Sequence, residues 1–133
     1  MSINIELSVG ELLDKITILQ IKAERINDVT KLENINKELQ VLLTLWGASP
    51  YSQSDLDENI NELKKVNEQL WDIEDKIRDK ESEQAFDEKF IELARSVYFT
   101  NDKRAEIKRA INTKTGSELI EEKSYSDYSA SSN

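Results

Sequence analysis

The sequence predicts an all-α protein, an antiparallel bundle of three to four helices. Helix-forming residues dominate this chain of 133 residues, which contains only three glycines and one proline. Apolar residues recur three and four positions apart over most of its length, the period of an amphipathic helix. Serine, threonine or aspartate precedes these stretches, where such residues cap helix N-termini.

The N-terminal segment, residues 2–7, differs from the rest because Ile3, Ile5 and Leu7 alternate with polar residues. That alternation is typical of a short half-buried strand. The bundle can therefore carry a short N-terminal strand that pairs with the C-terminal segment. The other placement for the C-terminal segment is across the bundle.

The first helix is predicted to begin after Ser8, because Ser8 and Glu11 match the S-x-x-E capping box. Ile18 and Ile21 lie outside its apolar stripe. The helix is thus apolar over more than one face and should contact a second element or a second chain. Its stripe consists of Leu12, Ile16, Leu19, Ala23 and Ile26.

Two further helices follow the same rules. Thr30 and Glu33 repeat the capping box, and Gly47 is predicted to end the second helix. A third helix is predicted to open at Ser54 and to run to Glu81. The apolar stripes are Leu32, Ile35, Leu39, Leu42 and Trp46 in the second helix, and Ile60, Leu63, Val66, Leu70, Ile73 and Ile77 in the third.

The fourth helix is predicted to be capped by Asp87, with Phe86 and Ile91 as a hydrophobic staple. The run "TND" at residues 100–102 contains three residues that favour caps, so we expect a kink or a break there. Gly116 should end the helix.

We expect one domain over residues 1–125 and a flexible tail over residues 126–133. The acidic run "EEKSY", which ends at Tyr125, is either an ordinary tail or a cover over a site.

Composition limits the function. A net charge of -9 argues against nucleic-acid binding, which needs a basic surface. The chain has no cysteine and no histidine, so thiol nucleophiles, soft metal sites and imidazole catalysis are excluded. No apolar run is long enough to span a membrane, and no signal peptide is recognisable, so we expect a soluble, cytoplasmic protein.

A polar face accompanies the apolar stripe of the third helix. Asn67, Trp71, Glu74 and Arg78 are spaced by four, three and four, and they line up on one side. This face is either the lining of a small-molecule pocket or a boundary tryptophan beside an intrahelical ion pair.

The fourth helix carries a second polar group. Residues 93–114 hold six basic and two acidic residues, a net of +4, whereas residues 54–92 hold six basic and fourteen acidic residues, a net of -8. Either the two helices pair their charges across a seam, with Glu74, Asp75 and Asp102 as the acidic partners, or the basic groups converge on an anion such as a phosphate. The candidate residues on this helix are Arg95, Tyr98, Asn101, Asp102, Arg104 and Lys108.

Glu11 and Asp14 stand one helical turn apart and are weak candidates for a Mg²⁺ site. Such spacing is common in an acidic chain, and Glu11 is also explained as the capping partner of Ser8. The hydroxyl of Thr17 is expected to bond back to the helix carbonyls. We therefore expect no cofactor.

Four segments between Ser8 and Tyr125 resemble a small bacterial and phage family, a domain of unknown function. They are "SVGELLDKITIL", "VNEQLWDIEDKIR", "FIELARSVYFTNDKRAEIKRAIN" and "GSELIEEKSY". Some members of that family lie in genomes beside glycosyltransferases and cell-surface polysaccharide enzymes, which would fit a sugar-phosphate or nucleotide-sugar ligand. The resemblance implies no catalytic residue.

Two functions remain open. The first is a noncatalytic binding or assembly module that forms a homo-oligomer, favoured because no nucleophile or base stands at a recognisable spacing. The alternative is an enzyme or sensor that binds a small anionic ligand, a phosphate, nucleotide or nucleotide sugar, between the third and fourth helices. Neither function involves nucleic acid or a membrane.

Overall fold

The computed structural model describes residues 2–124, and over that range the chain is helical without any strand. The predicted all-α bundle is therefore confirmed. The elements are α1 (Val9–Arg25), α2 (Val29–Ala48), the short 3-10 helix η1 (Pro50–Gln53), α3 (Asp57–Ser82) and α4 (Glu88–Thr115). None of the described helices is both long and apolar enough to cross a membrane.

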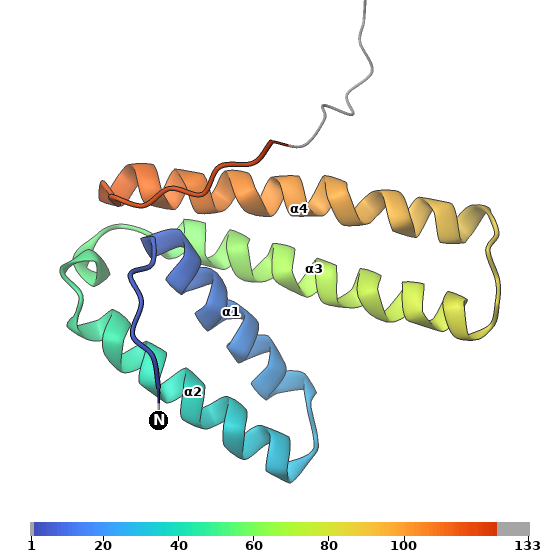
Figure 1. Ribbon diagram of the computed structural model, residues 1–133, viewed down its shortest axis with the longest axis horizontal. Helices are drawn as coiled ribbons and strands as arrows, with labels where there is room; N and C mark the ends of the chain where they lie inside the picture. The colour runs from blue at the N-terminus through green and yellow to red at the C-terminus, as the bar shows by residue number, and fades with distance from the viewer. Residues whose placement is uncertain (1, 125–133) are drawn as a thin grey trace, which may run out of the picture.

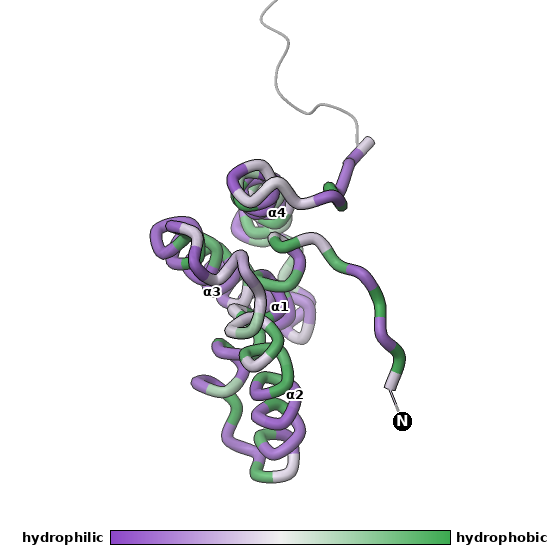
Figure 2. Tube along the Cα trace, turned by 90° about the vertical axis from the view of Figure 1, so that its left-hand side faces the viewer, coloured by the Kyte–Doolittle hydropathy of each residue, from purple (hydrophilic) through white to green (hydrophobic). Residues whose placement is uncertain are grey.

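The helices form two antiparallel hairpins of unequal length. Helices α3 and α4 run side by side and make the longer hairpin, and α1 crosses beneath one half of it (Figure 1). Helix α2 packs mainly on α1, on the side away from α3 and α4 (Figure 2). Helix α1 is therefore the central element of the fold.

The core lies where α1 meets α3 and α4. Its largest fully buried side chains include Leu13, Leu56, Leu63 and Ile111. Helix α2 has no buried residue. Its half-buried side chains Leu39, Leu42, Leu43 and Trp46 cover the core from outside.

The helix ends follow the sequence with three exceptions. Ser54 does not open α3, which begins at Asp57 after Leu56 and has no side-chain cap. Ser8 caps α1 as predicted, accepting a hydrogen bond from Glu11 N at 3.1 Å. The cap of α2 is Asp28, not Thr30, and α2 continues past Gly47 to Ala48. These errors arose because the capping box marked a helix start two residues late, and because a glycine alone need not end a helix.

Helix α4 is one continuous helix of 28 residues, so the break expected at residues 100–102 is wrong. Asp87 caps it as predicted, but Phe86 packs edge-on against Phe90, with ring centroids 5.3 Å apart, instead of stapling Ile91. Gly116 ends the helix in the left-handed region, at φ 66°.

The expected N-terminal strand is also wrong for the described residues. Residues 2–7 stand apart from the helices (Figure 2), and Ile3 and Ile5 are 89% and 69% exposed. The C-terminal segment, residues 117–124, neither pairs with the N-terminal segment nor crosses the bundle; it runs back along α4 (Figure 1). Tyr125 and the expected tail over residues 126–133 lie outside the described residues.

The far half of the long hairpin lacks a covering helix. Helix α1 ends at Arg25, whose guanidinium reaches Asp72 at 2.7 Å, and the hairpin extends well beyond that point (Figure 1). From residue 68 to residue 106, Leu93 is the single buried residue. This half of the molecule has almost no core of its own.

Candidate functional site

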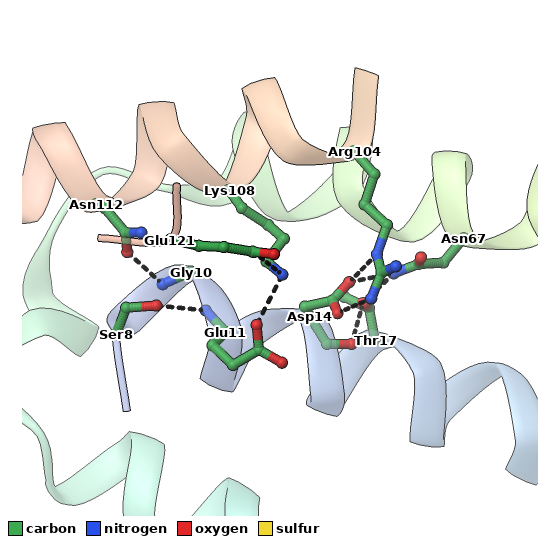
Figure 3. Close-up of polar contacts among 10 residues, drawn as sticks. All are labelled: Ser8, Gly10, Glu11, Asp14, Thr17, Asn67, Arg104, Lys108, Asn112 and Glu121. Carbon is green, nitrogen blue, oxygen red and sulfur yellow. Dashed lines mark hydrogen bonds and ion pairs between the residues drawn. The ribbon is translucent and has the colours of Figure 1, made fainter. Parts of the chain in front are cut away.

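A cluster of charged and amide side chains joins α1 to α3 and α4, and Asp14 is at its centre (Figure 3). Asp14 is 1% exposed although it is a carboxylate in an otherwise apolar stretch of α1. Arg104 on α4 binds both of its carboxylate oxygens, with Nε at 2.9 Å from Oδ1. Asn67 on α3 donates to Oδ1 at 2.9 Å.

Burial alone would raise the pKa of the Asp14 carboxyl. The hydrogen bonds from Arg104 and Asn67 outweigh that effect and hold the pKa below its usual range. The hydrogen bond to Asp14 likewise raises the pKa of the Arg104 guanidinium. Asp14 is therefore a buried, ionised carboxylate that is fully paired.

Thr17 completes this part of the cluster one turn further along α1. Its hydroxyl donates to the carbonyl of Asp14 at 2.9 Å, as the sequence predicted, and accepts from Asn67 Nδ2 at 3.0 Å. Asn67 thus bonds two side chains of α1 at once, which explains why an amide occupies a buried position on α3.

A second ion pair lies one turn along α4 at Lys108. Its ammonium group binds Glu11 at 2.7 Å and Glu121 of the C-terminal segment at 2.9 Å (Figure 3). Burial lowers the pKa of Lys108, but these two hydrogen bonds outweigh it and raise the pKa above the ordinary value. Glu11 therefore forms only half of a capping box, since its carboxylate turns to Lys108 instead of Ser8.

The start of α1 lies directly against the backbone of α4. Gly10 N donates to the side-chain oxygen of Asn112 at 2.7 Å. A Cβ atom at Gly10 would lie 2.6 Å from the carbonyl oxygen of Lys108. Only glycine lets the two helices approach this closely.

Together these contacts hold α1, α3 and α4 in one register. Each carboxylate has a cationic partner, and each buried side-chain polar atom in the described range has a hydrogen-bond partner. Glu11 and Asp14, the weak Mg²⁺ candidates, are bound to Lys108 and Arg104. Within residues 2–124, no group of three or more acidic side chains is arranged to hold a metal ion.

Half of the residues predicted as a ligand site do gather in one place. An open groove of about 440 Å³ lies where α1 leaves the long hairpin. Helix α3 provides both apolar and charged side chains to it, and Arg104 comes from α4. The lining residues are Ile18, Asn67, Leu70, Trp71, Glu74, Asp75, Arg78 and Arg104.

The remaining candidates do not line that groove. Arg95 is exposed, and its guanidinium lies 5.7 Å from the ring of Phe99. Tyr98 is 44% exposed, and Asn101 and Asp102 are half-buried. Lys108 lines a separate cavity of about 200 Å³ beneath the C-terminal segment.

The charge pairing expected between α3 and α4 takes a different form. Arg78 pairs within its own helix with Glu74 at 3.3 Å, and Arg104 pairs with Asp14 of α1. Helix α4 is therefore locked to α1 by charge. The sequence offered one signal for this, an aspartate in an otherwise apolar stretch of α1, but it offered none for Gly10 or Asn112. Glu121 belongs to the run "EEKSY", for which a cover over a site was one of the two interpretations.

These features define an all-helical protein whose central helix is fixed by a buried ion-pair cluster. The chain belongs to a family of unknown function (DUF6165), whose model matches residues 3–133. The resemblance found in the sequence is thus confirmed. Comparisons with curated proteins and with solved structures give no significant match.

Proposed function

We propose that this protein is a noncatalytic binding and assembly module that associates with itself. The observation that carries the proposal is the far half of the α3–α4 hairpin, where Leu93 is the single buried residue between residues 68 and 106. Two helices alone bury little apolar surface, and hairpins of this kind become stable by packing against further helices.

Exposed apolar side chains support the same function. Phe86 and Ile91 near the hairpin turn are both 55% exposed, and Phe99 is 43% exposed. On the other hairpin, Val41 and Leu45 are 62% and 57% exposed. A second chain that packs on this protein would cover exposed apolar side chains such as Phe86, Ile91, Val41 and Leu45.

The ion-pair cluster supports a structural role for the polar residues of α1 and α4. Asp14 and Arg104 hold each other in a fixed two-point geometry, and Lys108 is held between two carboxylates. Groups that are paired in this way fix helices in place, whereas a catalytic acid or base must exchange a proton with a substrate.

The groove at Trp71 supports a second candidate function, the binding of a small anionic ligand. Trp71 offers an aromatic surface, and Arg78 and Arg104 offer guanidinium groups. Glu74 and Asp75 line the same groove and repel an anion. For this reason the anion-binding function ranks second.

Sedimentation equilibrium at several protein concentrations tests the assembly function. We expect the average mass to rise from one chain toward two or more as concentration increases. A mass that stays at one chain throughout, with no partner retained on the immobilised protein, would remove the proposal.

A thermal-shift screen separates the two candidates. Nucleotides, nucleotide sugars and inorganic phosphate are added with and without Mg²⁺, since a ligand at 100 times its Kd stabilises a protein by about 2.7 kcal/mol. The assembly function predicts no shift. A shift that Arg78→Ala abolishes would favour the anion-binding function.

A further inference from the structure

The C-terminal segment lies over a cavity on α4 without filling it. The cavity has a volume of about 200 Å³. Helix α4 lines it with Lys108, Arg109 and Asn112, and the segment lines it with Glu121 and Glu122. A segment that served only to pack on α4 would close this space, because packed protein interiors leave few voids.

Two neighbouring carboxylates of the segment bind two neighbouring cations of α4. Glu121 binds Lys108 at 2.9 Å, and Glu122 binds Arg109 at 3.1 Å. The side chain of Lys108 is only 9% exposed, and its hydrogen bond lowers the pKa of the Glu121 carboxyl. Helix α4 therefore presents a site that is built to receive a pair of carboxylates.

Asn112 supplies a third donor, which the segment does not use. Its side chain is buried, and its oxygen accepts from Gly10 N at 2.7 Å, which fixes the orientation of the amide. Its nitrogen donates to no residue within residues 2–124, and Figure 3 shows it without a contact to the residues drawn. Since each fully buried side-chain polar atom in that range has a partner, this nitrogen reaches the open cavity.

The segment is bound weakly enough to be displaced. Leu119 and Ile120 are both 44% exposed, so the segment buries little apolar surface. The side chains of Glu122 and Arg109 are 71% and 56% exposed. Ion pairs as exposed as this one contribute little to stability.

Departure of the segment would leave the fold intact. Lys108 would keep Glu11 at 2.7 Å, so no buried charge would lose its last partner. Ser117 N donates to the carbonyl of Asn112 at 3.0 Å, and Val9 N donates to the hydroxyl of Ser117 at 3.4 Å. These bonds fix the start of the segment, so it can swing away from residue 118 onward.

We propose that residues 118–123 are a cover over a binding site on α4, and that this site takes an acidic segment of another protein in which two carboxylates stand side by side. The inference rests on the proposed binding function and names the chemistry of the partner. Glu121 and Glu122 occupy the positions of the partner's two carboxylates. The partner displaces them because it also fills the cavity and accepts a hydrogen bond from Asn112, which the cover does not.

Charge limits the partner to a short acidic motif. Glu106 lines the same cavity, and Glu11 binds Lys108. Without the cover, these two carboxylates balance Lys108 and Arg109, and the whole chain has a net charge of -9, so a long acidic run would be repelled. The same segment of a second copy is the poorer occupant, because it would leave the same cavity open.

An NMR titration of the full chain tests the site. Glu121→Gln and Glu122→Gln together remove the charges of the cover, and the probe is the peptide SELIEEK, a copy of residues 117–123. The peptide should shift the side-chain amide signal of Asn112 in this double variant. The natural chain should bind it about tenfold more weakly, because its own cover competes. Equal binding by the two chains, or no shift in the double variant up to millimolar peptide, would overturn the inference.

Matched controls test whether charge is recognised. The peptide SELIQQK should not bind the double variant. Adding Arg109→Gln to the double variant should weaken the binding of SELIEEK about tenfold or more, because a charged hydrogen bond is lost. Lys103→Gln makes the same change in charge at an exposed position outside the cavity, and it should leave binding unchanged. Equal binding of the two peptides, or equal effects of the two substitutions, would exclude this site, and thermal unfolding confirms that all variants fold.

Sedimentation equilibrium of the double variant separates this inference from self-association. The double variant should associate as the natural chain does, because the partner's segment comes from another protein. Loss of association would assign the site to the segment of a second copy, which overturns the inference while the assembly function stands. Retained association without any shift in the titration has the same meaning. A chain that neither associates nor binds the peptide overturns both.

Discussion

Asp14 is the residue on which the arrangement of the helices depends most. It is a buried carboxylate that receives bonds from both α3 and α4. Asp14→Ala leaves Arg104 without its partner, and removing one member of a buried ion pair costs about 3 kcal/mol or more. Because Arg104 is partly exposed, we expect about 3 kcal/mol, measured by urea unfolding. Glu74→Ala removes an exposed pair and should cost less than about 0.5 kcal/mol.

The free energy of unfolding at acid pH should depend on the ionisation of Asp14. Its pKa in the folded protein lies below the usual value, because its hydrogen bonds outweigh burial. The ionised group therefore stabilises the fold above about pH 4, and this contribution is lost as pH falls through the folded pKa. The unfolding free energies of the natural chain and Asp14→Asn should differ most near neutrality and converge in acid. A difference that is independent of pH would contradict this.

Gly10 tests the close approach of α1 and α4. Gly10→Ala would gain helix propensity, about 1 kcal/mol, but its Cβ would overlap the Lys108 carbonyl. The steric overlap with the backbone should destabilise the fold more than the gain in helix propensity stabilises it. We therefore expect the free energy of unfolding to fall by about 1 to 3 kcal/mol. Gly47→Ala is the control, since nothing lies within 4 Å of a Cβ there, and it should be neutral or stabilising. Equal changes in stability at both positions would show that helix propensity alone determines the effect of Gly→Ala.

For individual residues, the sequence predicted which polar side chains lie near the core, but not which residues they contact. Asn67, Arg104 and Lys108 were predicted as candidate ligand-site residues, and the structure places them in the polar cluster that joins α1 to α3 and α4. Their partners on α1 were not foreseen, because Glu11 was explained as the capping partner of Ser8 and Asp14 was considered only as a weak Mg²⁺ ligand. Contacts between residues about ninety positions apart leave no local pattern.

Among the elements, α4 shows how tertiary contacts override local preference. Residues 100–102 favour caps, yet the helix continues through them because it packs on α3 along its length. The four helices themselves were predictable, since the apolar period is a local property, and so are the caps of α1 and α4. The crossing of α1 beneath only one half of the hairpin was not.

The C-terminal segment is bound to α4 by ion pairs near its end, among them Glu121 with Lys108. Glu121→Gln should release it from Lys108, which keeps Glu11 as a partner. Because the Glu121 side chain is 48% exposed, the free energy of unfolding should change by less than about 0.5 kcal/mol. Amide hydrogen exchange in residues 118–124 should nevertheless become faster. Glu118→Gln should change neither quantity, and an equal effect there would show that Glu121 has no special role.

Over the whole molecule, stability should be uneven. Helix α2 has no buried residue and packs mainly on α1, whereas α1 is buried among the other helices. Amides of α2 should therefore exchange with solvent faster than those of α1, because local opening of α2 exposes little core. Equal protection of the two helices would mean that α2 is covered by another chain, which matched measurements at low and high protein concentration would reveal.

The central place of α1 has a consequence for the order of events during synthesis. Gly10 and Asp14 bind Asn112 and Arg104, so α1 receives these partners from a helix that is synthesised about ninety residues later. Until α4 emerges, α1 has only α2 and α3 to pack against. The contacts that fix α1 therefore form only after α4 has been synthesised, and a factor that shields α1 until then would help the chain to fold.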